Sequence, residues 1–400
     1  MLAVGDLGRR LQLIHAAQWL YAADGDPYAQ VVRGFSEDPY PSYEAVRRRG
    51  PLWRSRTGAL VTAHHRLATE LLDFPGMGTD VVDELGRPLL AVPLDEISRT
   101  ARDLTTPSPL SLVQGALVEQ AAGRAFEPLG TEFDFVAEVA QRIPVTLLAD
   151  RLGLSGRRRA RLVEGCADAG IALDGALCPQ RLEPARRMAA ACADIGALFA
   201  ELAGEPASGG LFAELRSATT GGDSFVEEAR ALGVLIAGAW VPVTTSLISN
   251  TVLALLDHPG EWPRIVEDPA RVSRAVDETL RYSPPVQLQA MVARTGLELA
   301  GVRVEPGDQV VVLVGAANRD PGIFPSPERF DPDRHHEPGH RPLVAGYPHP
   351  MVVPLASAVT EVVLRGMAAR FPRLRRSGPV VRRLRAPVTR GMVAFPVSTA

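Results

Sequence analysis

Two ordered segments in the C-terminal half constrain the fold of this chain more than any other feature. The first, DETLRY at 277–282, lies in an amphipathic stretch that predicts a helix ending before two prolines. Glu278 and Arg281 are three residues apart, so they share one face of this helix and can pair. The second segment, AANRDPGIFPSPERFDPDR at 316–334, is rich in proline and turn-forming residues and is predicted to be irregular. An ExxR pair alone occurs by chance in many helices and identifies no fold. The same pair followed by the downstream segment at this distance rarely occurs by chance, so the combination points to one particular fold.

The hydrophobic periodicity predicts a mainly α chain with a small β portion. Pro242 is expected to bend or interrupt a long apolar helix near the centre of the chain. Short β-like runs at 58–63 and 286–314, and a hairpin-like tail from residue 378, form the β portion. No repeat or linker is recognisable, so we expect one domain over residues 1–400. The expected longer helices cover residues 7–20, 111–126, 133–150, 155–170, 180–203, 224–256, 267–282 and 355–370.

Composition excludes several classes of function. The chain has 400 residues, 46% of them hydrophobic, and a net charge of −3, which gives no reason to expect a nucleic-acid partner. Every basic residue is arginine, so no Schiff-base or P-loop lysine exists. Cys166, Cys178 and Cys192 lack paired spacing and are expected to be buried thiols in a reducing cytoplasm. No secretion signal is evident, and the polar residues within 231–256 indicate a buried helix rather than a membrane span.

The order of four segments resembles the bacterial cytochrome P-450 superfamily of haem-thiolate monooxygenases. The segments are 277–282, Arg294 with the β-run that follows it, 316–334, and the helix 355–370. The resemblance is strongest over 225–400 and implies a mainly α, cytochrome P-450-like single domain. It also implies a buried structural cluster that supports the loop under the haem. The residues of this cluster are Glu278, Arg281 and Arg329.

Three parts of that family's haem site are missing here. Pro350 occupies the position of the haem cysteine, and proline cannot bind iron. Trp240 and Val241 follow Ala237-Gly238 in place of an acid–alcohol pair, although Thr244 or Thr245 stands near the alcohol's place. The HxxxR pair that contacts a haem propionate is not recognisable between residues 76 and 130. The pattern therefore predicts no cofactor, no catalytic residue and no enzyme activity.

Two alternatives to a haem-free scaffold remain open. His349, next to Pro350, could ligate haem iron as histidine does elsewhere, which would make the chain an oxidoreductase with unusual ligation. The vacated haem cavity could instead bind a small molecule. No metal ion is expected, because the histidines of this Pro-rich region lack metal-site spacing. These are His335, His336, His340 and His349.

The two ends of the chain carry a narrower resemblance. Residues 7–28 and 377–391 resemble the cysteine-less, P-450-like auxiliary proteins of deoxysugar glycosyltransferases in macrolide and anthracycline biosynthesis. This resemblance implies a protein that binds a TDP-deoxysugar glycosyltransferase and stabilises or activates it. It also implies a hetero-oligomer with two copies of each chain, and no membrane partner.

Residues 1–22 form an amphipathic helix that is the candidate docking element. Leu7, Leu11 and Ile14 fall on one apolar stripe, and Trp19 and Tyr21 are residue types favoured at interfaces. A stripe of this kind either docks on a partner or covers the chain's own core. Periodicity leaves both open, and the resemblance favours docking.

Overall fold

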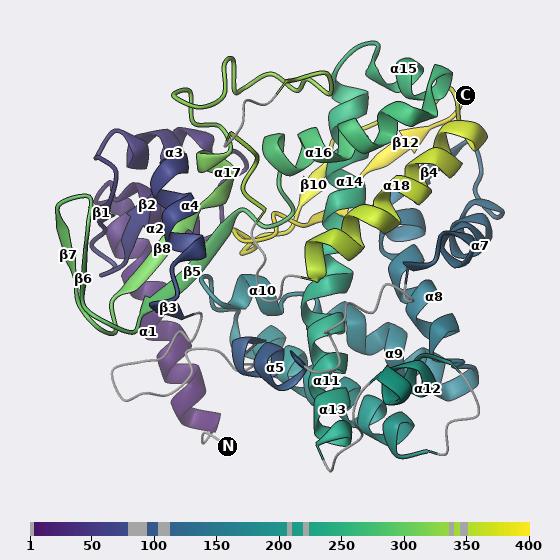
Figure 1. Cartoon of the computed structure of the whole chain (residues 1–400), viewed down its shortest axis with the longest axis horizontal. Helices are drawn as coiled ribbons and strands as arrows, with labels where there is room; N and C mark the ends of the chain where they lie inside the picture. The colour runs from purple at the N-terminus through teal and green to yellow at the C-terminus, as the bar shows by residue number, and fades with distance from the viewer. Residues whose placement is uncertain are drawn as a thin grey trace.

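A computed structural model describes residues 4–78, 94–102, 113–205, 210–218, 224–335, 340–344 and 351–400. A small sheet and the N-terminal helices form one part of the molecule, and a larger helical bundle forms the other (Figure 1). The predicted mainly α fold with a minor β portion is confirmed. Pro350, expected at the position of the haem cysteine, and His349, the alternative iron ligand, lie outside the described residues.

One long helix runs through the centre of the bundle (Figure 1). It consists of α13 (Phe225–Leu235), the π-helical turn η3 (Ile236–Trp240) and α14 (Val241–Asp257). Its C-terminal part packs against α18 (Val352–Arg370). Two helices, Phe225–Asp257 and α18, are apolar and long enough to cross a membrane, but 89% and 56% of their most apolar windows are buried inside the molecule. These helices therefore form the core of the bundle.

The predicted interruption of the long helix is a π turn that precedes Pro242. The N–H of Val241 donates to the carbonyl of Ile236, five residues earlier, which is the π-helical spacing. Pro242 then lies in the first turn of α14, where a missing N–H is tolerated. The turn changes which side chains of the helix point into the core, and Trp240 is at its end.

The five-stranded sheet has the order β1-β2-β8-β5-β3. Val310 in β8 pairs with Leu60 in a parallel ladder and with Met291 in an antiparallel one, so β8 is a central strand. Its run of valines suits a strand that is buried on both faces. The strands are β1 (Trp53–Arg54), β2 (Leu60–Thr62), β3 (Met77–Gly78), β5 (Leu288–Ala293) and β8 (Gln309–Leu313).

Three smaller strand groups complete the β portion. The hairpin β10–β11 confirms the hairpin predicted for the tail. The chain end joins the bundle through β12, which pairs with both β4 and β9. The bounds are β4 (Glu132–Asp134), β6 (Leu297–Leu299), β7 (Val302–Val304), β9 (Arg375–Arg376), β10 (Val381–Arg382), β11 (Met392–Ala394) and β12 (Pro396–Ser398).

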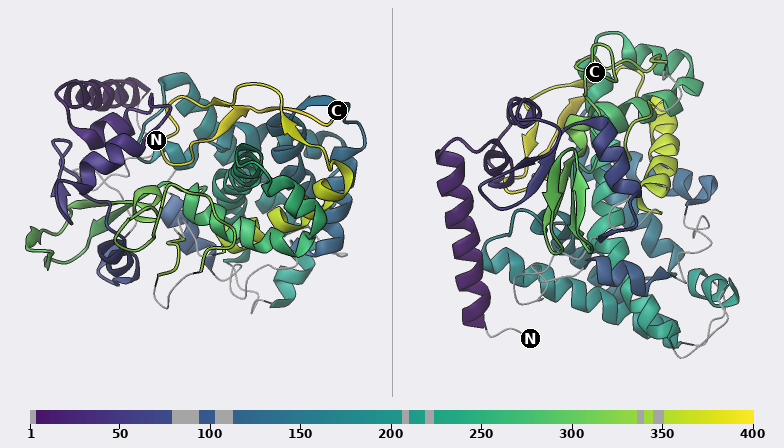
Figure 2. Two further views of the ribbon diagram at one scale, coloured as in Figure 1. Left: turned by 90° about the horizontal axis from the view of Figure 1, so that it is seen from above. Right: turned by 60° about the vertical axis from the view of Figure 1, so that its left-hand side comes forward.

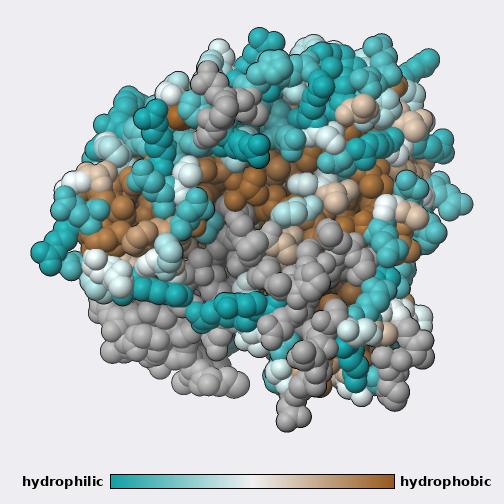
Figure 3. Space-filling model, viewed as in Figure 1, coloured by the Kyte–Doolittle hydropathy of each residue, from teal (hydrophilic) through white to brown (hydrophobic). Residues whose placement is uncertain are grey.

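The other helices cover the sheet and the bundle (Figures 1 and 2). Hydrophobic residues reach the surface across the middle of the face seen in Figure 1, with hydrophilic residues above them (Figure 3). The helices are α1 (Val4–Ala23), α2 (Pro27–Val32), α3 (Tyr40–Arg47), α4 (His65–Asp73), α5 (Leu94–Thr100), α7 (Gly115–Phe126), η2 (Val136–Ala140), α8 (Arg142–Arg151), α9 (Gly156–Ala169), α10 (Ala172–Gly175), α11 (Leu182–Gly204), α12 (Leu211–Ala218), α15 (Glu261–Glu267), η4 (Pro269–Arg271), α16 (Val272–Tyr282) and α17 (Val314–Ala317).

Asp174 in α10 ties the C-terminal segment to the helical bundle. Its buried carboxylate accepts hydrogen bonds from the N–H groups of Val388 and Thr389, at 2.8 and 2.9 Å, and from the Thr389 hydroxyl at 2.6 Å. Burial raises the pKa of Asp174 to about 6, because desolvation disfavours the charged carboxylate more than these bonds favour it.

The raised pKa of Asp174 predicts a specific pH dependence of stability. Between about pH 4 and 6 the folded chain holds a proton on Asp174 that the unfolded chain has lost, so this group's contribution to stability falls as pH rises through that window. The Asp174→Asn variant lacks this titration. Urea unfolding of both proteins should show the wild type losing on the order of 3 kcal/mol relative to the variant across the window. A constant difference between pH 4 and 7 would contradict the assignment.

Candidate functional site

The expected pair of Glu278 and Arg281 forms the centre of a buried network. Both side chains lie on α16 and are buried, and Arg281 is fully so. The Arg281 Nε and Nη2 atoms donate to the two carboxylate oxygens of Glu278, at 2.9 and 2.7 Å. The remaining donors reach backbone carbonyls of the 316–334 segment, at 2.8 to 3.1 Å. These carbonyls belong to Asn318, Pro327 and Arg329. All five guanidinium N–H groups are thus satisfied.

The third arginine of the network differs from the sequence prediction. The Arg329 side chain is exposed, and only its carbonyl oxygen joins the network. Arg334 takes the predicted place, with its Nε 3.4 Å from Glu278 Oε1 and its guanidinium bonded to the Arg329 carbonyl. A turn explains the difference. Ser326 has a left-handed φ of 46°, and the N–H of Arg329 donates to its carbonyl, which turns the Arg329 side chain outward.

Asn318 connects this network to the segment 340–344. Its buried amide nitrogen donates to the carbonyls of Leu280 and Leu343, at 3.1 and 2.9 Å, and its oxygen accepts from the N–H of Leu343 at 2.7 Å. On the neighbouring side, the His65 ring bonds the carbonyl of Arg341 at 2.8 Å. Hydrogen bonds from Asn318 on one side and from His65 on the other therefore fix the backbone of residues 340–344.

The central helix places an indole where the family's acid would lie. Trp240, at the end of η3, is fully buried, and its Nε1 has no acceptor among the described residues. The Thr244 hydroxyl donates to the carbonyl of Trp240 at 2.7 Å, and the Thr245 hydroxyl donates to the carbonyl of Ala140 at 3.3 Å. Both threonine protons are thus engaged by backbone, and the helix has no Asp or Glu between Glu228 and Asp257 that could be the acid of a proton relay beside them.

The three cysteines cannot replace the missing thiolate. Cys166 is on α9, Cys192 is on α11, and Cys178 lies between α10 and α11, so none is on α18 or the segment before it. All three are buried free thiols, as expected from the sequence. Burial raises the pKa of each to about 12, so they remain protonated at neutral pH. The residues present therefore do not fit a haem-thiolate centre.

By the resemblance, Arg294 matches an arginine that contacts a haem propionate in the family, and the histidines after residue 334 are not expected to hold a metal. The Arg294 guanidinium is exposed and lies over the backbone of Gly78, where a Cβ would come within 2.4 Å of its Nε. Among the described residues, which include His335 and His340 but not His336 or His349, no group of three His, Cys, Asp or Glu side chains is close enough to hold a metal ion.

Helix α1 places its predicted docking stripe against the chain itself. Leu11 is buried, and Leu7 and Ile14 are half-buried on the face of α1 that contacts α2 and α11. Side chains of α1 also bond the segment before α11: the His15 ring bonds the carbonyl of Pro179 at 2.6 Å, and the Gln18 amide donates to that of Leu177 at 3.0 Å.

The two predicted aromatic anchors on α1 differ in exposure. Trp19 is 47% exposed and contacts Phe35, with ring centroids 5.3 Å apart, and the Arg33 guanidinium. Tyr21 is half-buried. Of the predicted docking residues, Trp19 alone is largely accessible.

The outward face of α1 carries a second apolar stripe, which the predicted docking residues did not include. Leu13 and Leu20 are 62% and 66% exposed, and Ala16 between them is also exposed. Their spacing of three and four residues puts them on one face. The same spacing is visible in the sequence, but two apolar stripes on one helix do not tell which of them is covered. Figure 2 shows α1 lying along the edge of the molecule with one side free.

The central helix, its crossing with α18 and the Glu278–Arg281 network beside a small sheet define a protein of the cytochrome P450 type. The cytochrome P450 family model matches residues 272–345. The chain is 36% identical to the protein DesVIII of Streptomyces venezuelae, over 99% of this chain and 94% of that protein. It is 34% identical to the cytochrome P450 family protein EryCII of Saccharopolyspora erythraea, over 98% and 97%. The chain therefore belongs to the cytochrome P450 family.

Other comparisons agree with this assignment. The protein AknT of Streptomyces galilaeus is 36% identical over 99% of this chain and 96% of its own length. The ligand-free crystal structure of CYP164A2 from Mycobacterium smegmatis superposes with a TM-score of 0.76 at 25% identity, covering 93% of this chain and 99% of that one. The fold is thus retained over nearly the whole chain.

The network predicts unequal costs for two arginine substitutions. Arg281→Ala leaves the Glu278 carboxylate buried without its partner, and we expect a loss of about 3–5 kcal/mol in the free energy of unfolding. Arg329→Ala removes only an exposed side chain and should change it by less than about 0.5 kcal/mol. Urea denaturation followed by circular dichroism measures both. Equal losses would show that the Arg329 side chain, rather than that of Arg334, completes the network.

Proposed function

We propose that this chain is a non-catalytic, cytoplasmic auxiliary protein that binds a TDP-deoxysugar glycosyltransferase of macrolide or anthracycline biosynthesis and stabilises or activates it. The transferase would move the sugar from its TDP carrier to a polyketide aglycone. The resemblance of residues 7–28 and 377–391 to such auxiliary proteins supports the proposal. Similarity to DesVIII, AknT and EryCII over nearly the whole chain is consistent with it.

One observation carries the proposal: the buried network that the resemblance places beneath a haem is intact, whereas the sequence lacks the cysteine and the acid that the chemistry of this family uses. The Arg281 guanidinium keeps all its bonds. Pro350 replaces the cysteine, and Trp240 fills the acid position with a buried apolar ring. A chain that retains this costly buried pair without the groups it once supported serves as a rigid platform. A rigid platform suits binding to another protein, because less conformational entropy is lost on association.

The outward stripe of α1 is the docking surface we favour. Leu13, Ala16 and Leu20 present an exposed apolar face at helical spacing, which suits insertion into a groove between helices of a partner. Trp19 lies at the edge of this face and supplies an aromatic anchor. Assembly as two auxiliary and two transferase chains would leave one such surface for each transferase.

The proposed function predicts that the transferase depends on this chain. The partner deoxysugar glycosyltransferase should transfer sugar at least roughly tenfold faster after co-expression with the chain than when it is made alone. Product formation by liquid chromatography and mass spectrometry measures the difference. Equal rates, together with failure of the two proteins to co-purify, would exclude the auxiliary role.

A charge-substituted pair tests the docking surface. Leu13→Asp with Leu20→Asp should abolish co-purification with the transferase while leaving the circular dichroism spectrum and melting midpoint unchanged, because both side chains are exposed. Leu384→Asp, at a leucine that is 64% exposed on the C-terminal segment, is the matched control and should co-purify normally. Co-purification of the double variant at wild-type yield would refute docking through α1.

A charge at the covered stripe is expected to act differently. Leu11→Asp puts a carboxylate between α1 and the body of the molecule, and it should lower the melting midpoint rather than act only on binding. Differential scanning calorimetry of the isolated chain separates the two effects. A melting midpoint equal to the wild type would contradict the placement of Leu11.

A further inference from the structure

A cavity of about 570 Å³ lies between helices α7, α8, α9 and α14, next to the C-terminal segment. We call it the helical cavity. It faces the side of α14 that carries Pro242, Thr245 and Ser249, and Trp240 and Thr244 are not among its lining residues. Val241 and Thr245 of the same helix do line it, whereas no described residue of α18 or of the sheet strand β5 does. Its volume is in the range of pockets that bind small organic ligands.

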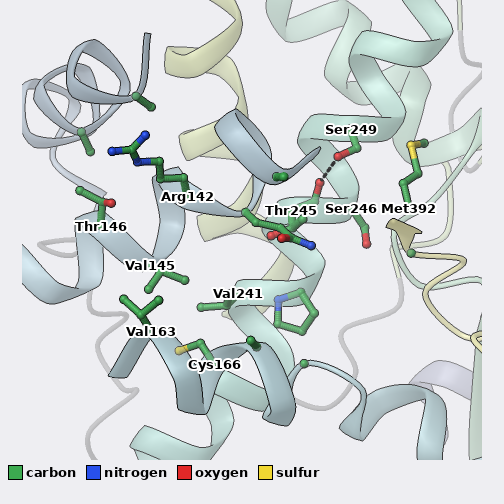
Figure 4. Close-up of a pocket in the computed structure, with 18 of the residues that line it drawn as sticks. Arg142, Val145, Thr146, Val163, Cys166, Val241, Thr245, Ser246, Ser249 and Met392 are labelled. Carbon is green, nitrogen blue, oxygen red and sulfur yellow. Dashed lines mark hydrogen bonds between the residues drawn. The ribbon is translucent and has the colours of Figure 1, made fainter. Parts of the chain in front are cut away.

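One wall of the helical cavity is apolar. Val145, Val163 and Val241 approach one another from α8, α9 and α14, with Cys166 beside them (Figure 4). Met392 of β11 contributes a flexible apolar side chain from the C-terminal segment. The raised pKa of Cys166 keeps it a neutral thiol, which adds no charge to this wall. Such a surface favours a hydrocarbon body.

The charged side chains that line the helical cavity are all arginines. Four arginines and no Asp or Glu are among its described lining residues. Arg124 and Arg159 both pair with Asp150, so they are partly neutralised. Arg142, at the start of α8, is exposed and has no ion-pair partner among the described residues. The cavity therefore has a positive group beside an apolar interior, which favours an anion.

Hydroxyl groups mark a second polar position. Ser249 donates to the carbonyl of Thr245 at 2.8 Å, and Thr245 donates to that of Ala140, so these two hydroxyls are engaged (Figure 4). The Ser246 side chain is nearly buried and lines the cavity, and its hydroxyl has no hydrogen-bond partner among the described residues. It can bond a polar atom of a ligand.

We propose that the helical cavity binds an apolar organic molecule that carries a single anionic group. The hydrocarbon body lies between the valines of α8, α9 and α14, and the anion lies near the guanidinium of Arg142. This site is independent of the proposed glycosyltransferase partner, because it uses none of the exposed residues of α1.

Dodecanoate is a suitable probe, and isothermal titration calorimetry of the full chain below the micellar concentration measures its binding. We expect one saturable site. Dodecyltrimethylammonium, with the same chain length and opposite charge, should bind at least about tenfold more weakly, because it meets Arg142 with a like charge. Equal affinity for the two, or no saturable binding of dodecanoate, would overturn the proposal.

Two substitutions locate the site. Val163→Trp fills the cavity from a position that is 48% exposed, and Arg142→Glu reverses the exposed charge. Each should weaken dodecanoate binding about tenfold or more. Arg142→Glu puts a like charge beside the carboxylate of the probe, and Val163→Trp removes apolar space that its hydrocarbon chain needs. Val381→Trp and Arg157→Glu change exposed residues outside the cavity and are the matched controls.

The controls and the substituted proteins together decide the outcome. Unchanged binding in both controls, with weakened binding in Val163→Trp and Arg142→Glu, supports the helical cavity as the site. Wild-type affinity in both cavity variants would place the ligand elsewhere and overturn the proposal. Arg142→Glu alters an exposed residue, so it remains informative if the tryptophan variant folds poorly.

Discussion

The five hydrogen bonds of the Arg281 guanidinium are the interaction on which the rest of the structure depends. They join α16 to the irregular segment 316–334, whose backbone carbonyls would otherwise be buried without donors. Glu278 balances the charge, and Arg334 closes the group from the far end of the segment. Burying a guanidinium is costly, and only a geometry that satisfies every donor makes it tolerable. The network thereby fixes one backbone arrangement of this segment. Asn318, which belongs to the segment, also fixes residues 340–344 through its two hydrogen bonds with the backbone of Leu343.

This network holds the backbone in place without taking part in chemistry. The network and the catalytic groups can therefore change independently of each other. The groups that activate oxygen in a haem-thiolate enzyme lie on other elements, at residue 350 and in the π turn of the central helix. In the sequence, Pro350 and Trp240 stand where the resemblance places these groups, and the Trp240 side chain is fully buried. In the function we propose, this chemistry is absent, and the surface and the remaining cavities are the places where the chain acts. The exposed stripe on α1 and the helical cavity are the two such places that we propose.

The sequence predicted the elements that depend on local patterns, and it was less reliable where tertiary packing decides. The long helix, the hairpin at the tail and the Glu278–Arg281 pair followed from periodicity and spacing. Arg329 was assigned to this network by the resemblance, but the left-handed turn at Ser326 points its side chain outward, and Arg334 takes its place. For α1, periodicity showed that it is amphipathic but could not tell which apolar stripe α2 and α11 would cover. The helical cavity joins side chains from four helices and had no signal in the sequence.

The absorption spectrum of the purified protein, made in haem-supplemented culture and recorded before and after dithionite and carbon monoxide, tests most directly whether the fold has lost its haem chemistry. We predict no Soret band from a protein whose circular dichroism shows a folded, mainly helical chain, because no described cysteine can supply a thiolate and Trp240 fills the acid position. A stoichiometric Soret band would contradict this. Its position would show whether His349 or another residue holds the iron, and the chain would then be an oxidoreductase.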